Sequence, residues 1–118
     1  MNNPSLLRLS EESRTPAFLT KKEVYEWIRT KRKTIELRRG KSQNGENITF
    51  LNGRNESVKA RILRKQEGTL YAVLNVATFK RIVPTAETLD EAVAFVKHIY
   101  PSTEGTFTTY EFELDQKE

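Results

Sequence analysis

The feature that most constrains the fold is a short alternating stretch, which is also the most basic part of the chain. Residues 31–39 contain five cations and one carboxylate, and their net charge of +4 equals that of the whole protein. Ile35 and Leu37 alternate with polar residues, and a period of two predicts a half-buried β-strand with those two side chains in a core. The opposite face would present polar side chains together, with a lysine at the entrance of the strand: Thr34, Glu36, Arg38 and Lys33. The residues alone leave two interpretations open, a basic solvated strand surface or the polar floor of a site.

Length and composition limit the class of protein. A chain of 118 residues forms one domain with a real hydrophobic core. It has no cysteine, which excludes disulfides, thiolate metal sites and a cysteine nucleophile. No apolar run approaches the ~18 residues of a membrane span, and no His, Asp and Glu cluster has metal-ligand spacing. We therefore expect a cytoplasmic protein without a membrane segment, a bound metal or a cofactor.

Charge is unevenly distributed along the chain. Residues 20–67 hold 14 cations and 6 anions, whereas residues 68–118 hold 4 cations and 8 anions. The remaining residues, 1–19, are neutral overall. A basic half suggests a polyanionic partner such as nucleic acid. The alternative is that this asymmetry is ordinary for a soluble protein and has no functional meaning.

The first half of the chain predicts a helix followed by the basic strand. Thr20 and Glu23 have the spacing of a capping box, which predicts a helix over residues 20–31. The strand then follows over residues 33–39. The single tryptophan, Trp27, lies with the apolar residues of this helix. It is expected to pack in the core or as a lid on a barrel, and the alternative is a platform on which a base stacks.

Two further strands and a final strand follow from alternation and turn signals. Residues 48–51 and 56–66 flank the turn sequence Asn52-Gly53, which is typical of a hairpin. Residues 106–114 alternate as a last strand. In the strand at 56–66, the face opposite the apolar residues would carry four side chains: Lys59, Arg61, Leu63 and Lys65.

The second half also contains the clearest helix. Residues 88–100 begin with a second capping box, Thr88 and Glu91, carry an apolar stripe at helical spacing, and stop before Pro101. The only histidine, His98, lies on the opposite side and should be exposed, which excludes a two-histidine ribonuclease mechanism and a Ser-His-Asp triad. Residues 69–81 suit either a strand or a helix.

Domain boundaries follow from these elements. We expect residues 1–19 to form an N-terminal extension, with a short strand near Leu6–Leu9 and a loop to Pro16. Residues 20–114 would form the folded domain, and residues 115–118 a frayed tail.

The basic strand resembles a known signature. Lys33-Thr34-Ile35-Glu36-Leu37-Arg38 is similar to the G-x-K-x-x-E-x-R motif of the ASCH domain family, and the order of elements over residues 20–114 agrees with it. The resemblance implies an α+β, PUA-like fold, a small β-barrel flanked by two or three helices. It also implies a helix over residues 69–81. The glycine of the motif falls on Lys31, which would have to adopt a left-handed conformation at some steric cost.

The resemblance implies a function in which RNA or a nucleotide binds in a cleft lined by Lys33, Glu36 and Arg38. Phosphate or a base edge would contact the two cations, and Glu36 would fix their side chains or accept from a base amino group. Other cations of the basic half would extend the nucleic-acid-binding surface: Arg32, Arg39, Arg61 and Lys65.

Two alternatives remain. The first is an RNA-directed enzyme, a ribonuclease or an amidohydrolase, with Lys33 and Glu36 as catalytic residues. One branch of ASCH proteins hydrolyses acetylcytidine with a lysine, a threonine three residues later and a distal glutamate. Lys33 matches that lysine, Glu36 occupies the threonine position, and Glu87 is the nearest candidate for the distal glutamate. The second alternative is a protein-interaction module of the transcriptional coactivator type.

Overall fold

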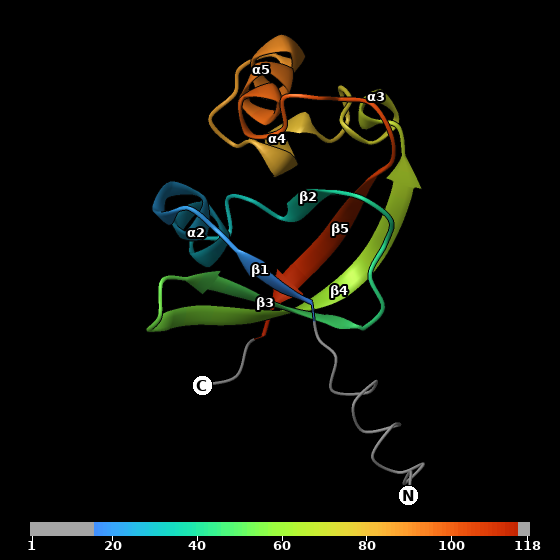
Figure 1. Ribbon diagram of the computed structural model, residues 1–118. Helices are drawn as coiled ribbons and strands as arrows, with labels where there is room; N and C mark the ends of the chain where they lie inside the picture. Colours follow the sequence, from blue (N-terminus) through green and yellow to red (C-terminus); the bar gives the residue numbers. More distant parts are fainter. Residues whose placement is uncertain (1–15, 116–118) are drawn as a thin grey trace, which may run out of the picture.

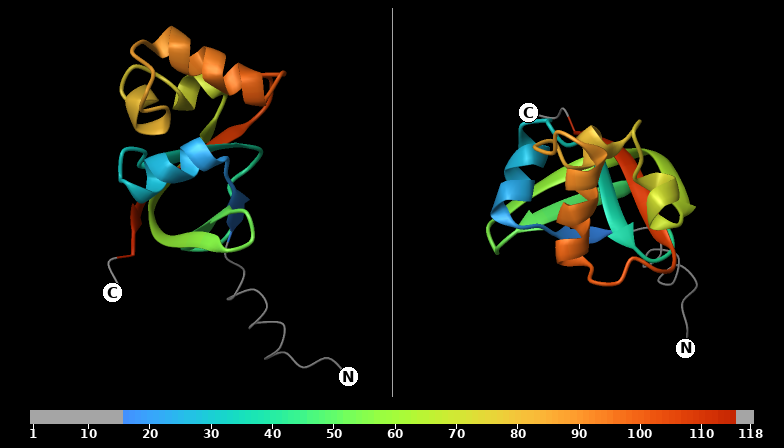
Figure 2. Two further views of the ribbon diagram at one scale, coloured as in Figure 1. Left: turned by 90° about the vertical axis from the view of Figure 1, so that its left-hand side faces the viewer. Right: turned by 90° about the horizontal axis from the view of Figure 1, so that it is seen from above.

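Five strands curl into a small barrel, and a layer of helices covers one end of it (Figures 1 and 2). The computed structural model describes residues 16–115. The strand order is β1-β3-β4-β5-β2, with β1 parallel to β3 and the other neighbours antiparallel. The strands are β1 (Ala17–Leu19), β2 (Ile35–Arg39), β3 (Asn47–Asn52), β4 (Glu56–Gly68) and β5 (Phe107–Leu114). The helices are α2 (Lys22–Arg29), α3 (Leu70–Val73), α4 (Phe79–Ile82) and α5 (Leu89–Ile99).

The two edge strands, β1 and β2, meet at the open seam of the barrel. Arg38 on β2 donates from Nη2 to the carbonyl oxygen of Leu19 on β1, at 2.9 Å. Helix α2 follows β1 and closes the same side, and its Ile28 is fully buried among the side chains inside the barrel. The seam is therefore closed by one arginine side chain and one helix rather than by a strand ladder.

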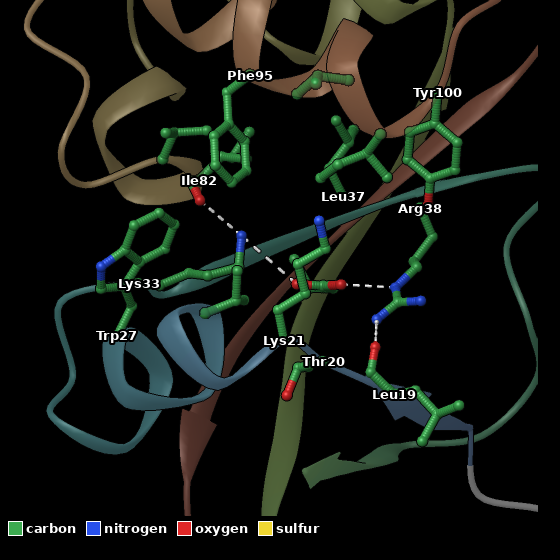
Figure 3. Close-up of a pocket in the computed structure, with 15 residues that line it drawn as sticks. Leu19, Thr20, Lys21, Trp27, Lys33, Leu37, Arg38, Ile82, Phe95 and Tyr100 are labelled. Carbon is green, nitrogen blue, oxygen red and sulfur yellow. Dashed lines mark hydrogen bonds and ion pairs between the residues drawn. The ribbon is translucent and has the colours of Figure 1, made fainter. Parts of the chain in front are cut away.

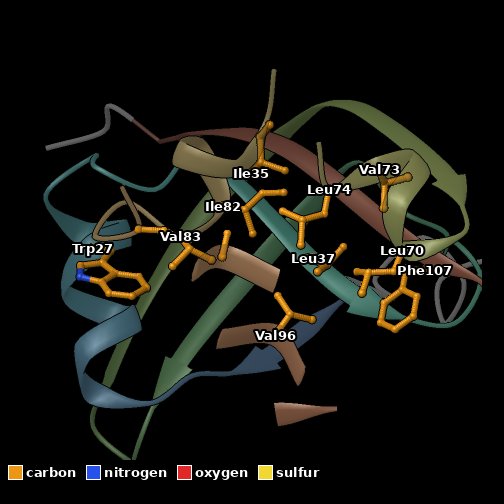
Figure 4. Close-up of a cluster of buried hydrophobic side chains, with 12 residues drawn as sticks. Trp27, Ile35, Leu37, Leu70, Val73, Leu74, Ile82, Val83, Val96 and Phe107 are labelled. Carbon is orange, nitrogen blue, oxygen red and sulfur yellow. The ribbon is translucent and has the colours of Figure 1, made fainter. Parts of the chain in front are cut away.

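Two hydrophobic clusters lie on opposite faces of the sheet. One fills the barrel with side chains from strands and from α2: Phe18, Ile28, Ile48, Phe50, Ala60, Tyr110 and Phe112. The other joins β2 and β5 to the helices and contains Trp27, Ile35, Leu37, Leu70 and Phe107 among others (Figure 4). Trp27 is 3% exposed and its ring centroid lies 5.7 Å from that of Phe95, so the predicted core packing of this tryptophan is confirmed.

Strand β2 is buried on both faces, which the sequence did not predict. Ile35 and Leu37 enter the cluster under the helices, as expected. Glu36 pairs with Tyr110 of β5 and is only 5% exposed. The barrel curls around this side of the strand and encloses it, so the expected solvated alternative is wrong for Glu36.

The start of α2 differs from the capping-box prediction. The N-cap residue is Lys21, and no side chain caps it. The hydroxyl of Thr20 instead donates to the carbonyl oxygen of Leu51 at 3.0 Å, and the Thr20 amide donates to the same oxygen at 2.8 Å. Thr20 thus continues the pairing of β1 with β3, so it is not available to begin the helix. The second capping threonine, Thr88, does accept from the Glu91 amide at 3.1 Å.

The predicted helix at residues 69–81 is two short helices, α3 and α4, separated by an irregular segment. Asn75 and Thr78 explain the interruption. The Asn75 side chain accepts from the Ala77 amide at 2.9 Å, and the Thr78 hydroxyl donates to the Val73 carbonyl at 2.9 Å. These local bonds satisfy backbone groups that a continuous helix would pair internally.

A β-bulge in β4 changes which cations share a face. The register shifts between Ile62 and Arg64, so Ile62 pairs with Phe112 and Lys65 pairs with Tyr110. Both partners belong to the barrel interior. Lys65 therefore lies on the same face as Ile62, and the predicted common face of Lys65 and Arg61 is wrong because the extra residue reverses the alternation.

The first strand of the sheet, β1, lies within the segment expected to precede the domain. It pairs with β3 from Ala17 to Leu19. The strand predicted near Leu6–Leu9 and residues 116–118 of the predicted tail lie outside the described residues. Within residues 16–115, no helix has the length and apolar character needed to cross a membrane.

Candidate nucleotide-binding cleft

A cleft of about 170 Å³ lies between the barrel and the helix layer (Figure 3). Strand β1 and the start of α2 form its lower wall, and α4 and α5 form its upper wall. Most of the lining is apolar, including Trp27 and Phe95. The charged side chains in the lining are Lys21, Lys33, Glu36 and Arg38. Three of these four residues are the motif residues, and the structure brings them together.

Glu36 is the centre of the charged group. Its Oε2 accepts from Nε of Arg38 at 2.6 Å, and its Oε1 lies 3.4 Å from Nζ of Lys33. The Glu36 side chain is 7% exposed, so both interactions lie in a largely dry environment. Electrostatic interactions are stronger there than in water, and the geometry of the three head groups is fixed relative to one another.

Lys33 links the barrel to the helix layer. Its Nζ donates to the carbonyl oxygen of Ile82 at 2.6 Å, and its side chain is 5% exposed. Burial lowers the pKa of Lys33 below its usual value, while the Glu36 carboxylate opposes part of this decrease. The amine therefore releases its proton more readily than an exposed lysine does.

The turn after α2 directs Lys33 into the cleft. The Lys31 amide donates to the Ile28 carbonyl at 3.0 Å, and the Arg32 amide donates to the Trp27 carbonyl at 2.8 Å. These two bonds form a Schellman motif, which normally requires a left-handed residue just after the helix. Lys31 has a φ of 67°, as expected where the signature has glycine. The Lys33 amide also donates to the Trp27 carbonyl, at 3.0 Å, which anchors the lysine backbone to the helix end.

Arg38 is held at three points. Besides Glu36 and the Leu19 carbonyl, its guanidinium lies over the ring of Phe18, 4.3 Å from the ring centroid. Its side chain remains 26% exposed. Arg38 thus orients the buried carboxylate while still presenting part of its charge to the cleft.

The other predicted nucleic-acid-binding residues do not line the cleft. Arg32 is exposed beyond the end of α2. Arg39 donates to the Ser102 carbonyl, and Arg61 pairs with Glu113. Lys65 donates from Nζ to the Gln43 carbonyl at 2.6 Å. Sequence reasoning missed Lys21, whose only signal was its place beside Thr20 at the start of a predicted helix.

The cleft does not reproduce the amidohydrolase arrangement. Among the described residues that line it, hydroxyl groups belong to Thr20 and Tyr100, and the Thr20 hydroxyl is engaged with Leu51. Glu36 occupies the position of the nucleophilic threonine, and Glu87 is exposed and outside the lining. The buried groups of the lining that can transfer a proton are the Lys33 amine and the Glu36 carboxylate. Residues 16–115 contain no group of three or more His, Cys, Asp or Glu side chains arranged to hold a metal ion.

Comparison with known proteins identifies the fold. No family model and no curated protein matches the chain. The crystal structure of the hypothetical protein PH0355 superimposes with a TM-score of 0.71 at 15% identity, over 86% of this chain and 100% of that one. A mutant of ZmASCH from Zymomonas mobilis superimposes with a TM-score of 0.59 at 15% identity, over 82% of this chain and 67% of that one.

The fold is therefore ASCH-like, an α+β architecture in which helices flank a small PUA-like β-barrel, and the fold prediction is confirmed. In the described part the flanking helices number four rather than two or three, because the segment at residues 69–81 divides. At 15% identity, these likenesses show the fold alone.

Proposed function

We propose that this protein binds RNA or a nucleotide in the cleft lined by Lys33, Glu36 and Arg38. The observation that carries the proposal is the convergence of these three charged side chains, two of them almost fully buried, on one cavity. Buried charges are costly to a fold, and apolar residues would stabilise the same space at least as well. A charged group retained there is consistent with a binding role. A cytoplasmic location fits this role.

The size of the cleft supports a single ring as the buried part of the ligand. An engineered protein cavity of about 150 Å³ binds benzene, and the cleft here has about 170 Å³. A six-membered pyrimidine ring matches that volume better than a purine does. The aromatic side chains of Trp27 and Phe95 provide apolar walls for a planar base.

The polar groups suit the edge of a base and its phosphate. The Glu36 carboxylate accepts hydrogen bonds, and the Lys33 ammonium donates them, so together they match a base edge that offers an N–H donor beside a carbonyl or ring nitrogen, as cytosine and uracil both do. Lys21 and Arg38 supply positive charge for phosphate. Cytidine and uridine nucleotides are accordingly the first ligands to test.

The experiment compares pyrimidine and purine nucleotides by isothermal titration calorimetry. The wild type should bind cytidine or uridine monophosphate more tightly than adenosine or guanosine monophosphate. Glu36→Gln should weaken binding, because the carboxylate orders Lys33 and Arg38. Simple charge attraction instead predicts tighter binding by this variant, since the change removes a negative charge. Circular dichroism of the variant provides the control for folding.

A second comparison separates the cleft from a wider basic surface. Binding of single-stranded RNA should weaken with salt, with a slope of about −0.7 per phosphate contact. Arg38→Met should lower affinity more than Arg61→Ala, because Arg61 lies outside the cleft and already pairs with Glu113. Equal losses of affinity in the two variants, or tighter binding by Glu36→Gln, would indicate that RNA binds to a general basic surface and not in the cleft.

One observation favours a second candidate, cleavage of RNA. Burial lowers the pKa of Lys33, which favours its amine as the acceptor of a proton from a ribose 2′-hydroxyl. The 2′-oxygen would then attack the adjacent phosphorus as the bond from phosphorus to the 5′-oxygen breaks, and the 5′-oxygen would leave as a hydroxyl after taking up a proton. Incubation of the wild type with RNA would then release 2′,3′-cyclic phosphate ends, and Lys33→Met would abolish them. Acetylcytidine should yield no acetate, because Glu36 stands where the nucleophilic threonine would be. Robust acetate release would contradict this assignment.

A further inference from the structure

The mouth of the cleft carries exposed apolar side chains that the proposed binding of a single nucleotide does not use. Among the described residues, five large apolar side chains are prominently exposed, and two of them, Leu19 at 70% and Ile99 at 41%, line this cleft. Single exposed apolar residues are common on protein surfaces. Here two line the same cleft, one from the barrel wall in β1 and one from the helix wall at the end of α5.

The cleft has two chemically different ends. Trp27, Lys33 and Ile82 lie at one end, and Arg38, Tyr100 and Leu19 lie at the other (Figure 3). We call Leu19, Ile99 and Tyr100 the mouth shelf. Glu36 stands between the two ends, bonded to Lys33 on one side and Arg38 on the other. The volume of about 170 Å³ belongs to the whole cleft, so a ring at the Lys33 end takes up most of it, and a second ring would rest against the exposed side chains of the mouth shelf.

We infer that the cleft takes a single-stranded RNA of at least two nucleotides, with one base at the Lys33 end and the neighbouring base on the mouth shelf. This inference rests on the proposed function. The shelf offers aliphatic and aromatic surface of the kind on which unstacked bases pack in single-stranded RNA recognition. The phosphate that joins the two nucleotides then lies beside Arg38, whose side chain is 26% exposed, and Lys21.

Charge complementarity supports a nucleic acid strand over an uncharged apolar partner. Arg38 lies at the same end of the cleft as the shelf, and Lys21 lies in the lining between β1 and α2 (Figure 3). Arg38 already pairs with Glu36, but an uncharged apolar partner would offer no counter-charge to Lys21 or to the exposed part of the Arg38 guanidinium. A double-stranded RNA would keep its bases stacked and could not place one on each site. A lone nucleoside has no second base to place on the shelf. The shelf should therefore give a single strand a higher affinity than either a double strand or a lone nucleoside.

The test uses dinucleotides of identical charge, measured by calorimetry. UpU carries two bases and one phosphodiester, and the two abasic analogues carry one base, at either position, with the same phosphodiester. Wild-type protein should bind UpU roughly tenfold more tightly than either analogue, a gain in the range reported for one stacked base. Equal affinity for UpU and an abasic analogue would overturn the inference and leave single-nucleotide binding intact.

Two variants test whether the mouth shelf causes the tenfold gain in affinity for UpU. Leu19→Ser combined with Ile99→Ser should reduce the tenfold ratio of affinities for UpU and the abasic analogues to about one, because the second base of UpU then gains little from the shelf. Val76→Ser is the matched control, because Val76 is 78% exposed and does not line the cleft, and it should keep the full ratio. A full ratio in the double variant would overturn the role of the shelf. Failure of the wild type to bind any of these ligands would overturn the proposed function as well.

Discussion

At the scale of single residues, the buried charged side chains in the cleft have hydrogen-bond partners, but their burial still costs folding free energy. Every buried side-chain nitrogen or oxygen in the described part of the chain has a hydrogen-bond partner. Lys33 nevertheless lies 5% exposed in an apolar environment, and desolvation is the main influence on its pKa. A buried lysine whose pKa is lowered makes the fold less stable when it must remain protonated. The pH dependence of stability therefore reports on this residue.

The first prediction follows from that lowered pKa. Between the pKa of Lys33 in the folded state and its higher value in the unfolded state, the unfolded chain binds more protons. The free energy of unfolding of the wild type, relative to Lys33→Met, should therefore rise with pH in this range, by at most about 1.4 kcal/mol per pH unit. Urea denaturation at a series of pH values from 7 upward measures the difference. A difference that falls with pH would mean that the attraction to Glu36 outweighs burial.

The second prediction concerns the left-handed residue after α2. A side chain at a φ of 67° is strained, and glycine removes that strain. Lys31→Gly should raise the free energy of unfolding by about 0.5–1 kcal/mol, after the greater entropy of glycine in the unfolded chain is allowed for. Lys31→Ala is the matched control, since it removes the same charge but keeps the strain. Equal stabilisation by both variants would point to charge rather than backbone conformation.

At the scale of elements, patterns that depend on neighbouring residues predicted structure well. The alternation around Ile35, the hairpin turn at Asn52-Gly53 and the stripe of α5 each correspond to an observed element. The motif also predicted that Lys33, Glu36 and Arg38 lie together, because two of them lie on one strand and the third lies two residues before it. Their contacts were accessible to sequence reasoning because they are local.

Features that depend on distant partners were not predictable in this way. Thr20 does not cap α2, because its hydroxyl and its amide both donate to the Leu51 carbonyl of β3. The bulge in β4 moved Lys65 to the inner face, and only the pairing with β5 reveals it. The enclosure of Glu36 depends on the barrel closing around β2. Long-range pairing decided each case, and a single sequence does not contain a local signal for it.

The third prediction concerns the attachment of β1, a strand of three residues at the edge of the sheet. Arg38 ties it to β2 across the seam through the Leu19 carbonyl. Arg38→Met should lower the hydrogen-exchange protection of the Thr20 and Thr49 amides, which donate between β1 and β3, by about tenfold. Arg39→Met, on the same strand, should leave both amides unchanged. Unchanged protection in Arg38→Met would show that α2 alone holds the seam.

At the scale of the whole molecule, the fold offsets the charge asymmetry of the sequence. Strand β4 belongs to the basic half and β5 to the acidic half, and the two pair along most of their length. Arg61 on β4 forms an ion pair with Glu113 on β5. Next to them, Glu111 on β5 lies opposite Arg64 in the strand register and forms an ion pair with Arg81 of α4. The outer surface of β4 is thus less attractive to polyanions than the sequence predicts.

The last prediction tests whether β5 masks this basic surface. Glu113→Gln should release Arg61 for phosphate, which raises the affinity for single-stranded RNA a few-fold at low salt and steepens the salt slope by about 0.7, the value for one added contact. Glu104→Gln makes the same change of net charge at an exposed position outside this pair, and it should have a smaller effect. Adding Arg61→Ala to Glu113→Gln should cancel the gain, because the released guanidinium is its cause. Equal gains from Glu113→Gln and Glu104→Gln would mean that only the net charge of the molecule matters, and that strand pairing does not shield β4.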